Sequence, residues 1–366
     1  MAEITPERIE AMFARLRAGN KQEEPRPGAN GAEAKKTSTP PRWMARIFGA
    51  DTLQHETFAP LTWLLPDLVP EGLTLLVSRP KLGKSWLALD IALGTAATRF
   101  VLGTLQPAAG EVLYLALEDG KRRLQRRLSK LLPTFNGTWP SGLTFATEWP
   151  RADQGGLVDL ESWIRHTIEK GKSPRLIVID TLARFRRPAA GKNAYLEDYA
   201  ALAELQKLPT KYNLAIVAVH HDRKAAADDV FDTVSGTLGT IAPVDVIAIL
   251  KRQAGAVALH ITGRDIDGAE KAVAFNKETC RWTILGEAAE VRRSDERARV
   301  LTVLQDAGEP LPISEIISLA HLVNRNAADN LLARMAKDGD VERLKRGLYG
   351  LPANLTQSEI RGNLTH

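Results

Sequence analysis

The stretch that most constrains the fold runs from Leu73 to Ala97 and reads LTLLVSRPKLGKSWLALDIALGTAA. A short run of Leu and Val leads to a turn with Gly83, Lys84 and Ser85, and a helical apolar pattern begins at once with Trp86. Gly-Lys-Ser between a strand and a helix is typical of a loop that binds phosphate. Inward-pointing backbone N–H groups and the positive end of the helix hold the phosphate oxygens there. The stretch therefore predicts an α/β fold with a nucleotide site.

Each residue type in this loop has its own expected task. Gly83 lets the backbone approach the phosphates, Lys84 reaches the β- and γ-phosphates, and the Ser85 hydroxyl coordinates Mg²⁺. Ser78 stands where the usual G-x-x-x-x-G-K-[ST] pattern has its first glycine. A surface turn is the alternative, and the flanking strand and helix favour the phosphate loop. The residues predicted to bind the nucleotide are Ser78, Arg79, Pro80, Lys81, Leu82, Gly83, Lys84, Ser85 and Trp86.

The composition limits what kind of protein this is. At 366 residues and 44% hydrophobic content, the chain can form one large α/β domain and a small one. Cys280 is the only cysteine, which excludes an intramolecular disulfide and a cysteine-based zinc site and predicts a cytoplasmic protein. No apolar run approaches the roughly 20 residues that cross a bilayer, so no membrane partner is expected. A net charge of +5 permits a polyanionic partner without requiring one.

A second apolar run, Val112–Leu117 (VLYLAL), ends in Glu118 and Asp119. Such a run is typical of a buried parallel strand, and the carboxyl ends of parallel strands face the crevice where α/β folds bind ligands. We therefore predict that Glu118 orients and polarises the water that attacks a phosphate. A helix N-cap role for the two acids is the alternative. The basic segment that follows, GKRRLQRRLSKLL, is expected to present a solvated charged face.

A third run, Leu176–Asp180 (LIVID), also closes on an acid. Asp180, with Thr181 beside it, lies about a hundred residues after the phosphate loop. An acid in this position holds the Mg²⁺ shell of many nucleotide sites. Ser85 and Asp180 are therefore the predicted Mg²⁺ ligands, and ATP with Mg²⁺ is the predicted cofactor.

A fourth run, Leu214–Val219, ends in His220 and His221. A polar side chain at the tip of this strand would lie beside the γ-phosphate and report its presence to the loop that follows, and His220 is the predicted sensor. A metal site at the histidine pair is disfavoured, because neither cysteines nor further histidines lie nearby. Three later segments are predicted to extend the sheet as strands: Val244–Lys251, Ala256–Gly263 and Ala272–Phe275.

Cationic residues follow the third and the fourth of these runs. The segment after the third run is rich in Ala, Gly and Pro, and the segment after the fourth is rich in Ala and Asp. Loops at the carboxyl edge of the sheet would face a central channel if the protein forms a ring, where cations would follow a phosphate backbone. Plain solvation is the alternative. The candidate contacts to single-stranded DNA are Arg184, Arg186, Arg187 and Lys192 after the third run, and Arg223 and Lys224 after the fourth.

Taken in order, these pieces resemble a known family, the RecA-like hexameric helicases, closest to plasmid RepA-type helicases and more distantly to DnaB replicative helicases. The resemblance covers about Leu61 to Leu285 and rests on SRPKLGKS, LYLALED, LIVIDT and AIVAVHHDRK, followed by ITGRD. It implies a RecA-like P-loop NTPase core with a mostly parallel sheet. It also implies a homo-oligomer, expected to be a hexamer, that encloses single-stranded DNA.

The same resemblance implies roles for individual residues. Glu118 corresponds to the catalytic glutamate, and His220 and His221 fall in the sensor region. An arginine finger would reach the ATP site of the neighbouring subunit. Its best positional match is Arg264 in ITGRD, with Arg252 in ILKRQ as the competitor. With Lys84 and Asp180, these assignments give the predicted catalytic set.

The end of the chain has a different character and resembles a winged helix. Three short helical patterns start at Ser294, Pro312 and Asn324, and an alternating segment around Gly347 follows as a β-wing would. In DNA-binding winged helices the third helix enters the major groove and the wing touches the backbone; protein docking is the alternative use. The candidate duplex contacts are Arg325, Asn326, Asn330, Arg334, Lys345 and Arg346.

Together these patterns predict four parts and one function. The parts are a flexible N-terminal segment and linker (1–41), a RecA-like ATPase domain (42–290), a winged-helix-like domain (294–352) and a polar tail (353–366). The predicted function is a Mg²⁺-dependent ATPase, a RepA-like DNA helicase acting in replication of a plasmid, phage or other mobile element. An ATP-switched DNA-binding regulator or recombination mediator without unwinding is one alternative. A nucleotide-binding scaffold without enzymatic activity is the other.

Overall fold

The structure is a computed structural model that describes residues 46–58, 60–132, 138–186, 194–221, 243–253 and 256–352. The chain divides into two units, Met1–Ala59 and Pro60–His366. The described part of the first unit contains the helix α2 (Ala50–His55), none of whose residues is buried. The predicted segment 1–41 and tail 353–366 lie outside the described residues. Among the helices that are described, none combines the length and the apolar character needed to span a membrane.

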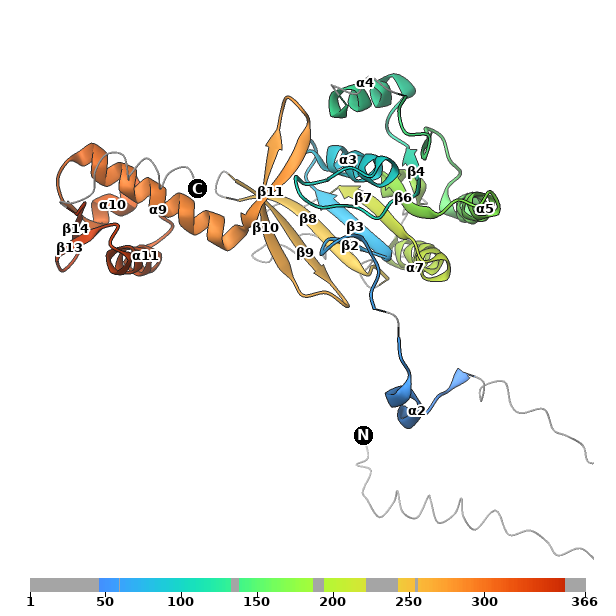
Figure 1. Cartoon of the computed structure of the whole chain (residues 1–366), viewed down its shortest axis with the longest axis horizontal. Coiled ribbons are helices and arrows are strands. Elements are labelled where there is room, and N and C mark those ends of the chain that lie inside the picture. Colours follow the sequence, from blue (N-terminus) through green and yellow to red (C-terminus); the bar gives the residue numbers. More distant parts are fainter. Residues whose placement is uncertain are drawn as a thin grey trace, which may run out of the picture. The chain divides into compact units, whose positions relative to one another are not determined.

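The second unit is built on one large sheet, in which nine strands of the described residues lie in the order β11-β10-β9-β8-β3-β7-β6-β4-β5 (Figure 1). From β8 to β5 all neighbours pair in parallel, whereas β9, β10 and β11 add antiparallel pairs at one side. The α/β fold with a mostly parallel sheet is therefore confirmed. The strands are β3 (Gly72–Ser78), β4 (Glu111–Ala116), β5 (Leu143–Ala146), β6 (Pro174–Asp180), β7 (Ala215–His221), β8 (Val246–Gln253), β9 (Ala256–Gly263), β10 (Ala269–Asn276) and β11 (Arg281–Glu287).

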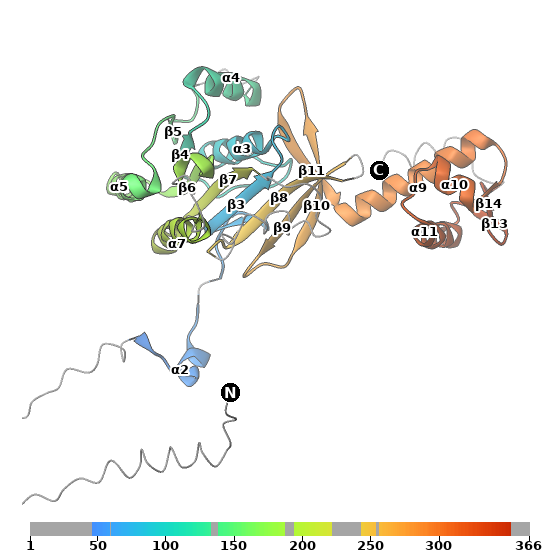
Figure 2. The same ribbon diagram turned by 180° about the vertical axis from the view of Figure 1, so that it is seen from behind.

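Helices cover both faces of the parallel part, because its strands carry apolar side chains on both faces and each face must be shielded from water. Alternate residues of β3 belong to different clusters: Leu76 packs with α3 and α4, whereas Leu75 packs with α5, α6 and α7. Figures 1 and 2 show α3 and α7 on opposite sides of the sheet. The helices are α3 (Lys84–Ala97), α4 (Lys121–Leu131), α5 (Gly156–Glu169), α6 (Leu182–Phe185) and α7 (Ala194–Tyr212), with a 3₁₀ turn at Ala152–Gln154 and a hairpin of β1 (Trp63–Leu65) and β2 (Val69–Pro70) before β3.

The last described elements form a small module with its own apolar core. Three helices, α9 (Ala288–Ala307), α10 (Ile313–Leu319) and α11 (Arg325–Asp338), accompany a sheet of order β12-β14-β13 within the described residues. Its core includes Val300, Ile316, Leu332 and Met335. The side chain of Asn324 caps α11 by accepting from the N–H of Ala327 at 2.9 Å. The strands are β12 (Leu311–Pro312), β13 (Glu342–Lys345) and β14 (Leu348–Gly350).

The helix α9 spans the predicted boundary between the two domains. The sequence places the ATPase domain's end at 290 and a new domain's start at 294, but α9 begins at Ala288 and runs through both positions without a break. Ala288 and Val291 pack against Ala258 and Ala272 of the large sheet, so the first turn of α9 belongs to the core. The winged-helix assignment of 294–352 remains a prediction.

Candidate nucleotide site

The site begins where β3 ends and α3 starts. Ser78 is the last residue of β3, and its hydroxyl donates to the backbone oxygen of Arg79 at 2.9 Å. Gly83 is the N-cap of α3 with φ of 104°, a left-handed conformation that favours glycine. Lys84, the first helical residue, is only 4% exposed. The predicted strand, loop and helix are all present. The first N–H groups of an α-helix have no partner four residues back, which suits them to bind an anion.

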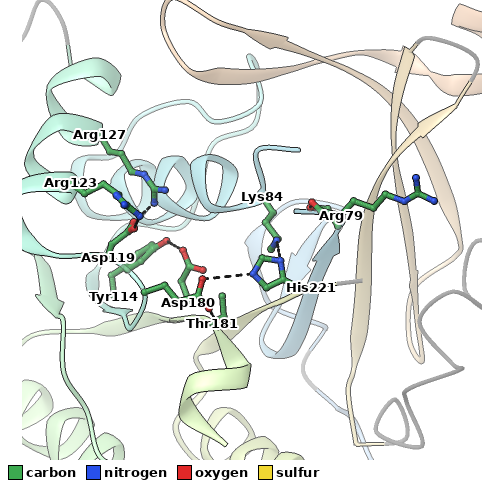
Figure 3. A network of polar contacts seen from close by, with 11 residues as sticks. Arg79, Lys84, Tyr114, Asp119, Arg123, Arg127, Asp180, Thr181 and His221 are labelled. Atoms are coloured by element: carbon green, nitrogen blue, oxygen red, sulfur yellow. Dashed lines mark hydrogen bonds and ion pairs between the residues drawn. The ribbon is translucent and has the colours of Figure 1, made fainter. Parts of the chain in front are cut away.

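Lys84 lies in the centre of a polar network (Figure 3). Its Nζ lies 2.6 Å from Nδ1 of His221 on the neighbouring strand β7. Burial lowers the pKa of Lys84, while the charges of Asp180 and Glu118 oppose that shift. These two carboxylates therefore favour the charged ammonium that phosphate recognition needs.

Asp180 ends β6 and is 5% exposed. It accepts a hydrogen bond from the hydroxyl of Tyr114 at 2.8 Å and another from Ser85. Burial raises the pKa of Asp180, and these two hydrogen bonds lower it again. One carboxylate in contact with the P-loop hydroxyl fits Mg²⁺, which takes one or two protein oxygens and completes its shell with water and phosphate.

Glu118 follows β4 and faces the same site. Its Oε1 accepts from the Thr181 hydroxyl at 2.9 Å, and its Oε2 lies 3.8 Å from Nε2 of His221. The side chain is 42% exposed, so water can reach it. Asp119 instead forms ion pairs with Arg123 at 2.9 Å and with Arg127 (Figure 3). The two adjacent acids thus have separate environments, and Glu118 is the more exposed of the two.

The structure brings His221, the neighbour of the predicted sensor His220, to Lys84 and Glu118. Neighbouring residues of a strand point to opposite faces. His220 is 5% exposed, whereas the side chain of His221 is 35% exposed. The strand end was predicted from its apolar run, but the face could not be chosen because both histidines fit the pattern.

A cavity of about 710 Å³ lies next to Glu118 and Trp86. The guanidinium of Arg127 lies 5.4 Å from the centroid of the Trp86 ring, a cation–π contact. The charges of α4 were predicted to be a solvated face, yet several of them line this cavity. The sequence signal that could have predicted this cationic lining is the run of paired arginines directly after Glu118. The cationic lining residues are Arg122, Arg123, Arg126, Arg127 and Lys130.

A family model described as an AAA domain matches residues 39–227, just over half of the 366 residues. The chain belongs to this AAA domain family. One similar solved structure is the ATPase domain of G40P, with a TM-score of 0.44 and 17% identity over 59% of this chain and 85% of that chain.

The matched AAA domain contains the phosphate loop, Glu118, Asp180 and His221. Family and site together identify the core as an AAA-type ATPase domain with the phosphate loop between β3 and α3. Strands β8 to β11 and the C-terminal module lie beyond the matched residues. The two arginine-finger candidates are therefore outside it and depend on position alone.

The strand register separates these two candidates. β9 runs antiparallel to β8, and Gly263 pairs with Val246, the first residue of β8. Arg264, whose N–H donates to the backbone oxygen of Asp245 at 3.1 Å, therefore lies at the amino edge of the parallel sheet. Arg252 is near the carboxyl end of β8, two residues beyond Leu250, the partner of Ser78. Arg252 thus shares an edge with the phosphate loop, and Arg264 lies at the opposite edge.

The structure describes only part of the predicted DNA-contact set. Arg184 is exposed on α6, directly after β6, and Arg186 follows that helix. Arg325 is exposed and lies 3.5 Å from Asp329 in an ion pair within α11. The other exposed candidates of the C-terminal module are Asn326, Asn330, Arg334, Lys345 and Arg346. The candidates outside the described residues are Arg187, Lys192, Arg223 and Lys224.

Proposed function

We propose that this protein is a Mg²⁺-dependent ATPase that works as an oligomeric, RepA-like DNA helicase in the replication of a plasmid, phage or other mobile element. One observation carries the ATPase part. Lys84, Glu118 and the Ser85–Asp180 pair come from different elements and meet at the carboxyl edge of one sheet. That is the edge at which open α/β sheets bind ligands.

Each side chain then has a defined task in phosphoryl transfer. The ammonium of Lys84 contacts the β- and γ-phosphates, while the N–H groups of the loop hold their oxygens. Ser85 and Asp180 would hold Mg²⁺, which would supply charge neutralisation for the transferring group. Glu118 orients the attacking water, and Thr181 holds one carboxylate oxygen of Glu118 in place.

His221 links recognition to hydrolysis. It lies between Lys84 and Glu118, at 2.6 Å from one and 3.8 Å from the other. A γ-phosphate that draws Lys84 away frees the imidazole for a new partner, so the histidine responds to whether triphosphate is bound. This behaviour supports His221 as the sensor in place of the predicted His220.

Steady-state hydrolysis of ATP with Mg²⁺ tests this function. We expect Lys84→Ala to lower turnover by about a hundredfold or more, because charge stabilisation in the transition state is lost. Glu118→Gln should keep ATP binding and lose turnover. Matched controls are Lys277→Ala and Glu278→Gln, which change exposed residues in the turn between β10 and β11. Wild-type protein without ATP turnover, or an unchanged rate in Glu118→Gln, would contradict the assignment.

The DNA part of the proposal is supported by the cations after β6, because α6 starts at the same edge of the sheet as the phosphate loop. Single-stranded DNA in a ring would contact Arg184, Arg186 and the cations of the segments outside the described residues. We expect single-stranded DNA to raise ATP turnover and a forked duplex to be separated in an ATP-dependent reaction.

The exposed cations of the C-terminal module favour a second candidate, an ATP-switched DNA-binding regulator or recombination mediator. They lie on α11 and around the turn between β13 and β14, where a winged helix contacts DNA. Sequence-specific duplex binding without strand separation would support this candidate over the helicase.

A further inference from the structure

Trp282 connects the outermost strand of the sheet to the phosphate loop. It lies on β11, 199 residues from Gly83, yet its indole Nε1 donates to the backbone oxygen of Gly83 at 3.2 Å. The ring also covers the glycine itself, since a Cβ added to Gly83 would lie 3.1 Å from Cζ2 of Trp282. Trp282 is only 2% exposed. The outer strand thus contributes a buried donor to the nucleotide site.

The indole is held in place from two directions. Phe275 is paired with Trp282 across β10 and β11, and the ring centroids lie 5.0 Å apart. The preceding residue, Arg281, forms an ion pair with Asp90 of α3 at 2.9 Å and donates to the backbone oxygen of Phe100 at 2.7 Å. Asp90 is 1% exposed, so removing Arg281 would leave a buried carboxylate without this partner, and the pair links β11 to the helix that follows the phosphate loop.

The bond to Gly83 determines where the next N–H group points. The Gly83 oxygen also accepts from the N–H groups of Trp86 and Leu87, each at 3.1 Å. Because the peptide between Gly83 and Lys84 is planar and trans, its N–H points away from its carbonyl. Fixing the oxygen with the indole therefore aims the N–H of Lys84 in the opposite direction. That N–H belongs to the helix N-terminus, whose free donors bind anions.

We propose that Trp282 is a positioning residue for the phosphate loop, which fixes the Gly83–Lys84 peptide so that its N–H is ready to receive a phosphate oxygen. This inference rests on the proposed ATP site and deepens it. Lys84, Glu118 and Asp180 belong to the AAA domain match, whereas Trp282 lies 55 residues beyond its end at 227.

The test compares Trp282→Phe with Trp149→Phe. The first variant keeps an aromatic ring at this position and removes the indole donor together with part of the ring volume. The matched control removes the same kind of bond elsewhere, because the indole of Trp149 donates to the backbone oxygen of Gly156 at 3.1 Å. We measure MgATP affinity by titration calorimetry, the melting temperature without nucleotide, and amide hydrogen exchange of the peptide covering Leu82 to Leu87 in nucleotide-free protein.

Trp282→Phe should bind MgATP about three- to tenfold more weakly, the worth of one neutral hydrogen bond. Exchange in the loop peptide should be faster, and Trp149→Phe should show neither change at a similar melting temperature. Phe275→Leu, which loosens the indole without touching Gly83, should give a smaller loss of affinity and replaces Trp282→Phe if that variant does not fold.

The two readouts separate this inference from the function on which it rests. If wild-type protein does not bind ATP but loop exchange still rises in Trp282→Phe, the ATPase proposal fails and the positioning contact stands. If exchange in the loop is unchanged and affinity falls no further than in Trp149→Phe, the positioning role is overturned.

Discussion

At the scale of single residues, Asp180 carries two conflicting demands. It must be ionised to bind Mg²⁺, yet burial raises its pKa and so favours the neutral acid. The hydroxyl of Tyr114 offsets this, because a donor stabilises the carboxylate. Tyr114 is fully buried, and burial beside Asp180 raises the pKa of its own hydroxyl, so that hydroxyl remains a donor.

We therefore predict a shifted pH profile for Tyr114→Phe. Without its donor the pKa of Asp180 rises further, so MgATP turnover should be lost at a higher pH on acidification than in the wild type. The matched control is Tyr212→Phe, which removes a hydroxyl that donates to Glu161 at 2.7 Å on α5. Turnover is measured across the acid range. The prediction is contradicted if the wild type and both variants lose turnover at the same pH.

The same residue allows a stability prediction of defined sign. A carboxyl whose pKa is raised in the folded state contributes stability below its unfolded pKa and loses it as pH rises through the folded pKa. Asp180→Asn should thus raise the melting temperature of nucleotide-free protein at neutral pH, by a few degrees at most for a core of this size. At acidic pH the increase in melting temperature over the wild type should be smaller. A melting temperature below that of the wild type at neutral pH would contradict the prediction.

At the scale of secondary structure, the parts of the site that are local in sequence could be predicted. Lys84, Glu118 and Asp180 each follow a buried apolar run, and parallel strands bring such ends to one edge. Two features could not be predicted. The choice between His220 and His221 depends on which face of β7 looks toward the loop, and Trp282 reaches Gly83 only because β9, β10 and β11 extend the sheet and pack against α3. The apolar periodicity of the sequence indicates neither the face of β7 that looks toward the loop nor the contact between Trp282 and Gly83.

The position of β8 and β9 also leads to a prediction on the arginine finger. Arg252 lies on the edge of the phosphate loop and Arg264 on the opposite edge. We expect Arg252→Ala to lower turnover by about a thousandfold, as loss of a finger does. Mixing with Lys84→Ala subunits should restore part of it if the arginine acts across an interface. The prediction from the sequence names Arg264, and a larger loss with rescue in Arg264→Ala would restore that assignment.

At the scale of the whole molecule, the C-terminal module has an apolar core of its own. The duplex DNA contacts proposed for this module can therefore be changed without altering the packing around the proposed nucleotide site. We predict that Lys345→Ala with Arg346→Ala weakens duplex binding and leaves DNA-free ATP turnover unchanged. Each cation that contacts a phosphate contributes about 0.9 to the slope of log affinity against log salt, so the slope should fall by about 2. Fluorescence anisotropy over a salt series measures both quantities. The matched control, Lys277→Ala with Arg293→Ala, removes two exposed cations elsewhere. An unchanged slope in the wing variant would instead favour a protein-docking module.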